Sequence, residues 1–444
     1  MLELQRSLAS TSWAVSVFGV QQGLNLLAPD GRNRANADFY SVTSAIQEQF
    51  SASPFLYALD QFGDAAQGAL VDTFWDVLQL RALTPQWLGQ TGGRLFRAAL
   101  DAVIALAPEE NLEAAWSEVR NTFRVISLVN RASAILNLPA GPLDISSVIR
   151  RAYLEGGQYA ALWLIEGAGE EFADRNWTST GLPRGLLSSG PGADLPESSL
   201  LMMHAGMGIA FARRTAEQLT PYTADPEIVA ALRLFIDLVR TNARPGYQGP
   251  AFESLGLVTQ TWYPRMVPLF DRNLWTLDTA ALEFFWHGVG RATYFTPQYL
   301  LPGASPFDGV ARMAPHQLGR LNGIAGAAWA FTLVNIQDPK VILNLLKRER
   351  DAVASNDAFS NGASSTVVMA LDMIPGDPLP RALTDYRPDT SDQSLAELWR
   401  CLVQVPCERA IHRYFPALKR SGRLGEVFRY QDLERLAGEA GGRS

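Results

Sequence analysis

The chain has almost no cysteine. Its 444 residues include two, Cys401 and Cys407, and no second pair accompanies them. Two cysteines cannot build the disulfide framework of a small secreted protein, and their C-x5-C spacing lacks the other half of a zinc signature. We therefore expect two ordinary thiols in a reducing cytoplasm.

Long apolar runs are also missing. The longest, residues 323–334, spans 12 residues, which is too short to cross a bilayer as a helix. The first twenty residues are interrupted by Glu3, Gln5 and several Ser and Thr, so they make a poor signal peptide. We expect no transmembrane segment and a cytoplasmic protein.

Basic charge is not in surplus. The formal net charge is −7, and no run of Lys and Arg is interleaved with aromatic residues, which argues against a nucleic-acid partner. The sequence also contains no G-x-S-x-G, no P-loop and no H-E-x-x-H. These absences exclude the common hydrolase, nucleotide-binding and zinc-protease signatures.

Helical periodicity is abundant, whereas short alternating β-strand patterns are scarce. Residues 112–129 and 227–240 place apolar side chains three and four positions apart. The connecting stretches are rich in Pro and Gly, as in residues 138–142, 243–250 and 372–380. The sequence therefore predicts an all-α fold.

A degenerate repeat organises the middle of the chain. Six apolar, small-residue-rich segments, most of them glycine-rich, each begin with one polar residue, and the intervals between these residues are 49, 49, 34, 35 and 39. The polar residues that open the segments are Glu155, His204, Glu253, His287, Asn322 and Asn361. Each interval accommodates a helix, a loop and a returning helix.

The spacing predicts stacked helical hairpins, either an α/α toroid or a bundle around a central apolar cavity. We expect an N-terminal helical extension over residues 1–110, the repeat domain over 111–390, and C-terminal helices with a tail over 391–444. Glycine costs about 1 kcal/mol relative to alanine inside a helix. We therefore expect the glycines to serve close helix packing, with the polar residues pointing inward.

Five of these stretches resemble a bacterial family of unknown function whose genes often lie beside polyketide and other natural-product clusters, including those for enediynes. They are RAYLEGGQYAAL (151–162), LMMHAGMGIAFAR (201–213), GYQGPAFESLG (246–256), FWHGVGRATYF (285–295) and HQLGRLNGIAGAAWAF (316–331). The resemblance covers roughly residues 110–390. It implies a role in specialised-metabolite biosynthesis. Phe252 stands where family members carry a histidine.

Two histidines and two carboxylates form the first candidate site. Glu155, His204, Glu253 and His287 could ligate a divalent metal such as iron, since imidazole and carboxylate suit such ions. No local ligand pair supports this, so the four would have to converge from separate helices. The alternative is a ring of polar residues bonded to neighbouring helix ends.

Carboxylates among aromatic residues form the second candidate site. Asp271 and Asp278, with Glu253 and His287, are the candidate catalytic residues, because an apolar setting can keep a carboxylic acid neutral for protonating an alkene. Asp278 also fits an ordinary helix N-cap followed by an aromatic core. Aromatic faces stabilise cations by about 0.5–2 kcal/mol each. The candidate substrate-binding residues are Trp262, Trp286, Arg291, Tyr294 and Trp329.

Arg291 follows His287 by four residues and shares its helix face. It could bind a phosphate or carboxylate of a ligand, or it could be a buried ion-pair partner of Glu253 or Glu283. The segment from Asn356 to Ser364 resembles a magnesium–diphosphate motif in part, but a serine replaces the required glutamate. We read that segment as a helix start.

The leading functional hypothesis is an enzyme of specialised metabolism. It would bind a hydrophobic polyene or isoprenoid and catalyse a terpene-cyclase-like cyclisation or an isomerisation, assisted by an acid or by a divalent metal such as magnesium or iron. The alternative is a non-catalytic protein that sequesters a hydrophobic small molecule. A carbohydrate-active toroid with a carboxylate pair fits the apolar segments less well.

Overall fold

The computed structural model describes residues 109–139, 141–177, 181–190, 192–296 and 305–441. These residues form helices joined by turns and loops, with no β-strand among them, which confirms the all-α prediction. The extension predicted for residues 1–110 lies almost wholly outside the described residues. None of the helices in the described part combines the length and the apolar character needed to cross a membrane.

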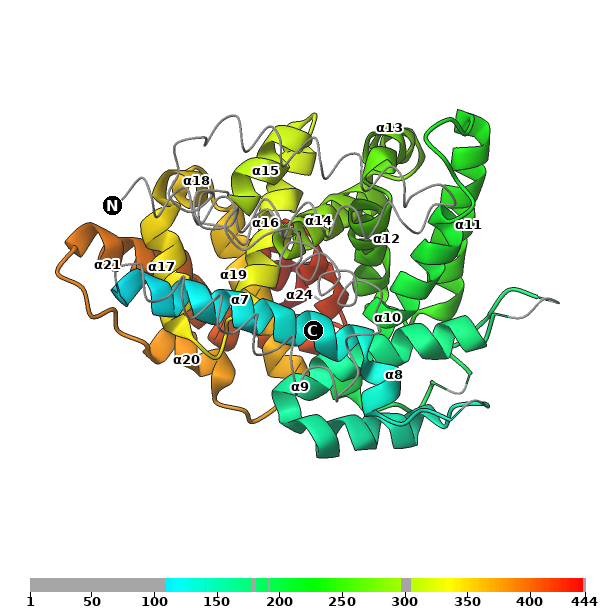
Figure 1. The fold of residues 1–444 in the computed structure, drawn as a ribbon, viewed down its shortest axis with the longest axis horizontal. Helices are drawn as coiled ribbons and strands as arrows, with labels where there is room; N and C mark the ends of the chain where they lie inside the picture. Colours follow the sequence, from blue (N-terminus) through cyan, green and yellow to red (C-terminus); the bar gives the residue numbers. More distant parts are fainter. Residues whose placement is uncertain (1–108, 140, 178–180, 191, 297–304, 442–444) are drawn as a thin grey trace, which may run out of the picture. The chain divides into compact units, whose positions relative to one another are not determined.

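The six repeat segments are six helices that pack one against the next in chain order. Figure 1 shows them following one another from α9 and α10 to α19. These inner helices are α9 (Ile145–Arg175), α10 (Glu197–Ala216), α12 (Gln248–Trp262), α14 (Thr279–Phe295), α16 (Gln317–Val334) and α19 (Ala358–Met373). In α16 every residue from Asn322 to Val334 is buried, as expected for a helix that is apolar all round.

Glycine sets the distance between neighbouring inner helices. A β-carbon added to Gly256 of α12 would lie 1.8 Å from Phe285 O of α14, and one added to Gly288 would lie 1.9 Å from Glu253 O. One added to Gly290 of α14 would lie 1.9 Å from a backbone oxygen of α16. The helices therefore meet backbone to backbone, and the predicted packing role of the glycines is confirmed.

Other helices return the chain between the inner ones. They are α11 (Asp225–Asn242), η2 (Pro264–Met266), α13 (Val267–Leu277), α15 (Pro306–Met313), α17 (Pro339–Arg348), α18 (Arg350–Ala354) and α20 (Leu379–Asp385). In α17 the buried residues Val341, Ile342, Leu345 and Leu346 form one face. This amphipathic pattern places the returning helix on the outside of the row.

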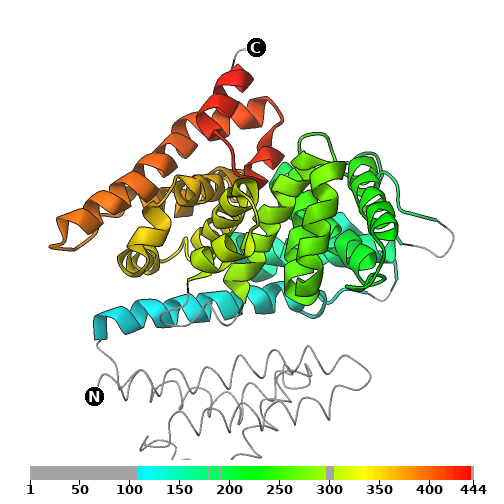
Figure 2. The same cartoon turned by 90° about the horizontal axis from the view of Figure 1, so that it is seen from above.

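Two further groups of helices cover the row from opposite sides, as Figure 2 shows. On one side lie α7 (Glu109–Asn130) and α8 (Ala132–Ile135), which come before the row in the chain. Side chains of α7 form hydrogen bonds with the carboxyl ends of α14 and α16. The C-terminal helices cover the other side. They are α21 (Gln393–Trp399), η4 (Arg400–Gln404), α22 (Val405–Arg409), η5 (Ala410–Tyr414), α23 (Phe415–Arg420), η6 (Leu424–Phe428) and α24 (Leu433–Gly441).

The segment from Gln393 to Arg420 is one long helix with two wide turns. Each π-helical stretch, η4 and η5, is followed two residues later by a proline, Pro406 or Pro416. Proline lacks the N–H that the helix needs and clashes with the preceding turn. Widening that turn relieves the clash, so the helix continues and packs along α19.

The interior of the row is filled, and the central apolar cavity that we predicted is not present around the predicted lining residues. Trp286, Tyr294 and Trp329 are each at most 1% exposed, so other protein atoms enclose them almost completely. Trp262 lies elsewhere and is 42% exposed at the end of α12. Glycine contacts draw the backbones together, and the aromatic side chains occupy the remaining volume.

We predict that Gly290→Ala lowers the free energy of unfolding by about 3 kcal/mol, because the new methyl group meets backbone oxygen across the α14–α16 crossing. The matched control is Gly438→Ala in α24, where nothing lies within 4 Å of the added carbon. That control should gain up to about 1 kcal/mol. Thermal and urea unfolding measure both, and equal effects would contradict the packing role.

Candidate functional site

A buried charge network lies where α9, α12 and α14 meet. The Nδ1 atom of His287 lies 2.9 Å from Glu253 Oε1, and the Arg291 guanidinium donates to Glu253 Oε2 at 3.0 Å. Arg291 also donates to Glu166 Oε1 at 2.5 Å. All four side chains are at most 3% exposed. The structure thus brings together three of the predicted site residues and adds Glu166.

Helix geometry explains why these side chains meet. His287 and Arg291 are four residues apart on α14, so they project from the same helix face. Gly288, which follows His287, lies against the backbone oxygen of Glu253. The absence of a side chain at Gly288 brings α12 close enough for the Glu253 carboxylate to reach both partners on α14.

Arg291 binds two carboxylates whose pKa values shift in opposite directions. Burial opposes ionisation of Glu253, but Arg291 and the His287 hydrogen bond lower its pKa overall. Burial raises the pKa of Glu166, and Arg291 offsets this only in part. The two carboxylates together raise the pKa of Arg291 against the effect of its burial. The positive charge of Arg291 therefore keeps Glu253 ionised. Glu166 is the carboxylate that takes up a proton more readily.

The hydrogen bonds also determine the tautomer of the His287 ring. An ionised Glu253 carboxylate only accepts, so the network assigns the proton of the neutral ring to Nδ1. Nε2 is then the basic nitrogen. The ring faces two aromatic side chains, with centroids 6.1 Å away for Trp329 and 6.4 Å away for Phe428.

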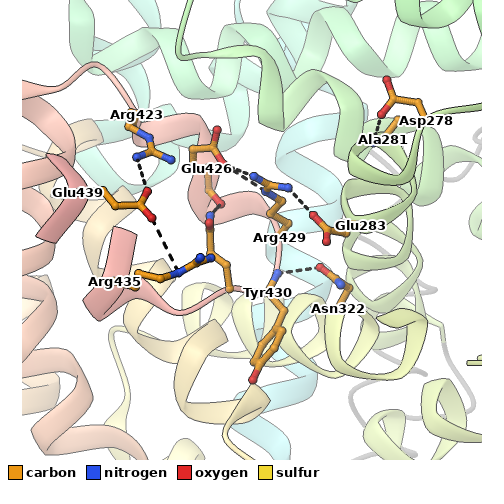
Figure 3. A network of polar contacts seen from close by, with 11 residues as sticks. Asp278, Ala281, Glu283, Asn322, Arg423, Glu426, Arg429, Tyr430, Arg435 and Glu439 are labelled. Atoms are coloured by element: carbon orange, nitrogen blue, oxygen red, sulfur yellow. Dashed lines mark hydrogen bonds and ion pairs between the residues drawn. The ribbon is translucent and has the colours of Figure 1, made fainter. Parts of the chain in front are cut away.

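Phe428 belongs to a segment, residues 424–431, that contacts the amino-terminal parts of α12, α14, α16 and α19. The Phe428 side chain is fully buried, and its ring lies 5.5 Å from that of Trp329. Figure 3 shows the polar contacts that hold the next two residues. Arg429 pairs with Glu283 of α14, and Tyr430 N donates to Asn322 Oδ1 at 2.7 Å.

Polar residues that open the repeat segments therefore bind this covering segment. Besides the Asn322 contact, Asn361 donates to Gln431 O at 2.6 Å. Glu426 holds Arg429 from within the segment at 2.6 Å. In Figure 3, Glu439 of α24 pairs with Arg423, the residue before this segment, and with Arg435 of its own helix. The covering segment is thus tied to α14, α16 and α19.

The four predicted metal ligands do not come together, which corrects that prediction. Glu155 is exposed where α9 bends at Gly157, a residue with a φ of 63°. His204 Nδ1 contacts Leu200 O at 2.6 Å, and its Nε2 accepts from Arg244 N at 3.0 Å. Both ring nitrogens are used, and burial lowers the pKa of His204 to about 4. Among the described residues no cluster of three or more His, Cys, Asp or Glu side chains could hold a metal.

Asp271 and Trp286 form a separate polar contact with a histidine that we did not predict. Trp286 Nε1 donates to Asp271 Oδ1 at 2.6 Å, and His316 Nε2 lies 2.9 Å from the same oxygen. His316 Nδ1 accepts from Gly319 N and so caps α16. Because both ring nitrogens are engaged, this cluster fixes Trp286 and the start of α16.

Asp278 has the structural role that the sequence left open. It is the N-cap of α14 and accepts from Ala281 N at 3.0 Å, as Figure 3 shows. It also pairs with Arg240 at 2.8 Å. A surface pocket of about 170 Å³ lies beside it and is lined by Arg233, Ile236, Asp237, Arg240, Leu277 and Asp278. Asp278 is therefore distant from His287 and belongs to the surface.

Tyr294 lies two helix turns beyond His287 and faces α7. Its hydroxyl contacts Thr122 at 2.9 Å and accepts from Asn335 at 3.1 Å. Burial raises the pKa of nearby Glu118 to about 7, and Arg348 opposes this. A surface pocket of about 300 Å³ is lined by Arg120, Asn121, Arg124, Gln337 and Asp338. Tyr294 thus belongs to a polar contact between α7 and the row.

Two members of the site were missed from the sequence. Glu166 is a lone carboxylate inside an apolar helical stretch, and this rarity is a signal that could have found it. Phe428 has no such signal, because aromatic residues are common in this chain.

The Asn356 segment is a helix start as we predicted, since Asn356 Oδ1 accepts from Ala358 N.

The arrangement around His287 is suited to proton transfer. A carboxylate bonded to Nδ1 orients the ring and stabilises it when Nε2 takes up a proton. The surroundings are dry and aromatic, so the electrostatic effect of Glu253 and Arg291 is stronger than in water. Of all the predicted site residues, Glu253, His287, Arg291 and Trp329 form this one cluster.

Comparison with known proteins gives no match to a family model, to a curated protein or to a solved structure. The family resemblance of the glycine-rich segments therefore stays a prediction.

We predict that Glu118→Gln makes stability less dependent on pH. The folded-state pKa of Glu118 is raised from 4.5 to about 7, so the folded state favours the protonated acid and loses stability as pH rises through this window. The loss is about 3 kcal/mol at most. Urea unfolding should show similar stability for both proteins at pH 4 and a more stable variant at pH 8. An unchanged difference across this range would contradict the assignment.

Proposed function

We propose that the protein is a cytoplasmic enzyme of specialised metabolism that moves a proton on a hydrophobic polyene or isoprenoid, giving an isomerisation or a cyclisation. His287 acts as the acid–base group, Glu253 orients it, and Arg291 keeps Glu253 ionised. The observation that carries the proposal is the 2.9 Å contact between His287 Nδ1 and Glu253 Oε1 in a fully buried setting.

The surroundings of His287 support an apolar substrate. Trp329 and Phe428 face the ring, and neither carries a charge. The face of Trp329 already lies 5.1 Å from the Arg291 guanidinium, so this aromatic side chain stabilises positive charge. The resemblance of the glycine-rich segments supports a specialised metabolite as the source of the substrate.

We predict that His287→Gln lowers the rate of proton transfer by at least about 100-fold, a typical contribution of an acid–base group. The purified protein would be incubated in D₂O with polyprenyl diphosphates, with and without Mg²⁺, and with conjugated polyenes. Mass spectrometry of organic extracts detects deuterium incorporation and cyclised products. The wild type should incorporate deuterium, and His287→Gln should not.

Two histidine variants control for effects on folding. His412→Gln changes an exposed side chain, and His204→Gln changes a buried one whose ring is bonded to Leu200 and Arg244. Both should retain deuterium incorporation at the temperature where they are folded. Incorporation that survives in His287→Gln would contradict the proposal. Tight binding of a polyene by the wild type without incorporation would support a non-catalytic binding protein instead.

A further inference from the structure

Two buried N–H groups beside His287 have no acceptor. They are Arg291 Nε and Trp329 Nε1, in side chains that are at most 3% exposed. The guanidinium carbon lies 5.1 Å from the Trp329 ring centroid, and this ring lies 6.1 Å from that of His287. Both groups only donate, so neither satisfies the other. A buried donor without an acceptor is unfavourable and rare in folded proteins.

The neighbours of these donors keep them in place. The two terminal nitrogens of Arg291 each donate to a carboxylate, that of Glu253 or of Glu166, and Nε is the guanidinium nitrogen without an acceptor. The backbone oxygen of Trp329 accepts from Thr366 Oγ1 at 3.0 Å, which ties this turn of α16 to α19. Donors that are fixed before a ligand arrives need no reorganisation to bind it.

The charges around the donors indicate which acceptor fits. Arg291 is balanced by the ionised Glu253, and Glu166 takes up a proton readily because burial raises its pKa. A carboxylate ligand would add an uncompensated negative charge to a dry site. A neutral carbonyl oxygen accepts two hydrogen bonds and adds no charge.

We propose that Arg291 Nε and Trp329 Nε1 bind the carbonyl oxygen of an apolar, unsaturated ketone or aldehyde, whose apolar part takes the place of Phe428 next to His287. This inference rests on the proposed function and names the substrate class. Phe428 packs against both His287 and Trp329, so the covering segment, residues 424–431, moves aside when the substrate enters.

The chemistry that follows is a double-bond shift. In a β,γ-unsaturated ketone or aldehyde, His287 Nε2 takes a proton from the carbon between the carbonyl and the C=C bond, the C–H electron pair forms a new C=C bond to the carbonyl carbon, and the C=O π pair moves to oxygen as a dienolate. The two N–H groups stabilise this oxygen. The protonated His287, balanced by Glu253, returns the proton to the γ-carbon, where the π pair of the original C=C bond forms the new C–H bond. The carbonyl reforms, and the remaining C=C bond is conjugated with it. No oxidant or reductant is consumed.

The test compares two probes that differ in one group. β-Ionone is an apolar conjugated ketone, and its methylidene analogue has CH₂ in place of the carbonyl oxygen. We expect the full-length protein to bind the ketone about tenfold more tightly, as measured by calorimetry. Trp329→Phe removes the N–H and keeps an aromatic ring, so it should abolish most of this preference.

Trp399→Phe is the matched control, because Trp399 is equally buried, also has an unpartnered Nε1, and packs against Tyr386 instead. It should leave the preference for the ketone unchanged. Equal affinity for the two probes, no binding of either, or a preference that persists in Trp329→Phe would overturn the carbonyl site.

A second measurement separates this site from the proposed function. NMR in D₂O follows exchange of the methyl hydrogens next to the carbonyl of β-ionone, which are the acidic hydrogens adjacent to this carbonyl, in the wild type and in His287→Gln. Exchange that depends on His287 supports both proposals. A ketone preference that depends on Trp329, without exchange in the wild type, retains the carbonyl site and rejects proton transfer. Deuterium exchange in other polyenes, without a preference for the ketone, retains proton transfer and rejects the carbonyl site.

Discussion

Neighbouring inner helices touch backbone to backbone at glycine, and the described structure depends on these contacts. A β-carbon at Gly256, Gly288 or Gly290 would lie within 2 Å of a backbone oxygen on the next helix. The same crossings place the Glu253 carboxylate within hydrogen-bonding distance of α14 and bring Trp329 of α16 to the His287 ring. Packing and chemistry are therefore determined by the same residues.

The charges of the interior follow from this packing. Because Arg291 is buried, its partners have to come from neighbouring helices, and they come from α9 and α12. Removing one partner of such a buried group typically costs about 3–5 kcal/mol. The network thus links α9, α12 and α14. The single positive charge of Arg291 is enough to lower the pKa of Glu253, whereas the pKa of Glu166 stays raised by burial.

The repeat of glycine and polar residues predicted the helices, their order and the close packing, because periodicity and residue size are local properties. It did not predict which polar residues meet. Glu155 opens its segment as Glu253 does, but α9 bends at Gly157 and leaves Glu155 exposed. Glu166, three turns further along, reaches Arg291 instead. Of the two partners predicted for Arg291, Glu253 was correct, whereas Glu283 binds Arg429, since the crossing points of helices decide such pairings.

Residues 424–431 follow all six inner helices in the chain, and this order has a consequence for folding during synthesis. The ribosome completes the whole inner row before it makes Phe428, so the nascent row presents His287 and Trp329 without their cover. Asn322 and Asn361, whose side chains later hold Tyr430 and Gln431, bond to water until then. Until then, the apolar side chains at this end are open to chaperones, and to a ligand already present in the cell.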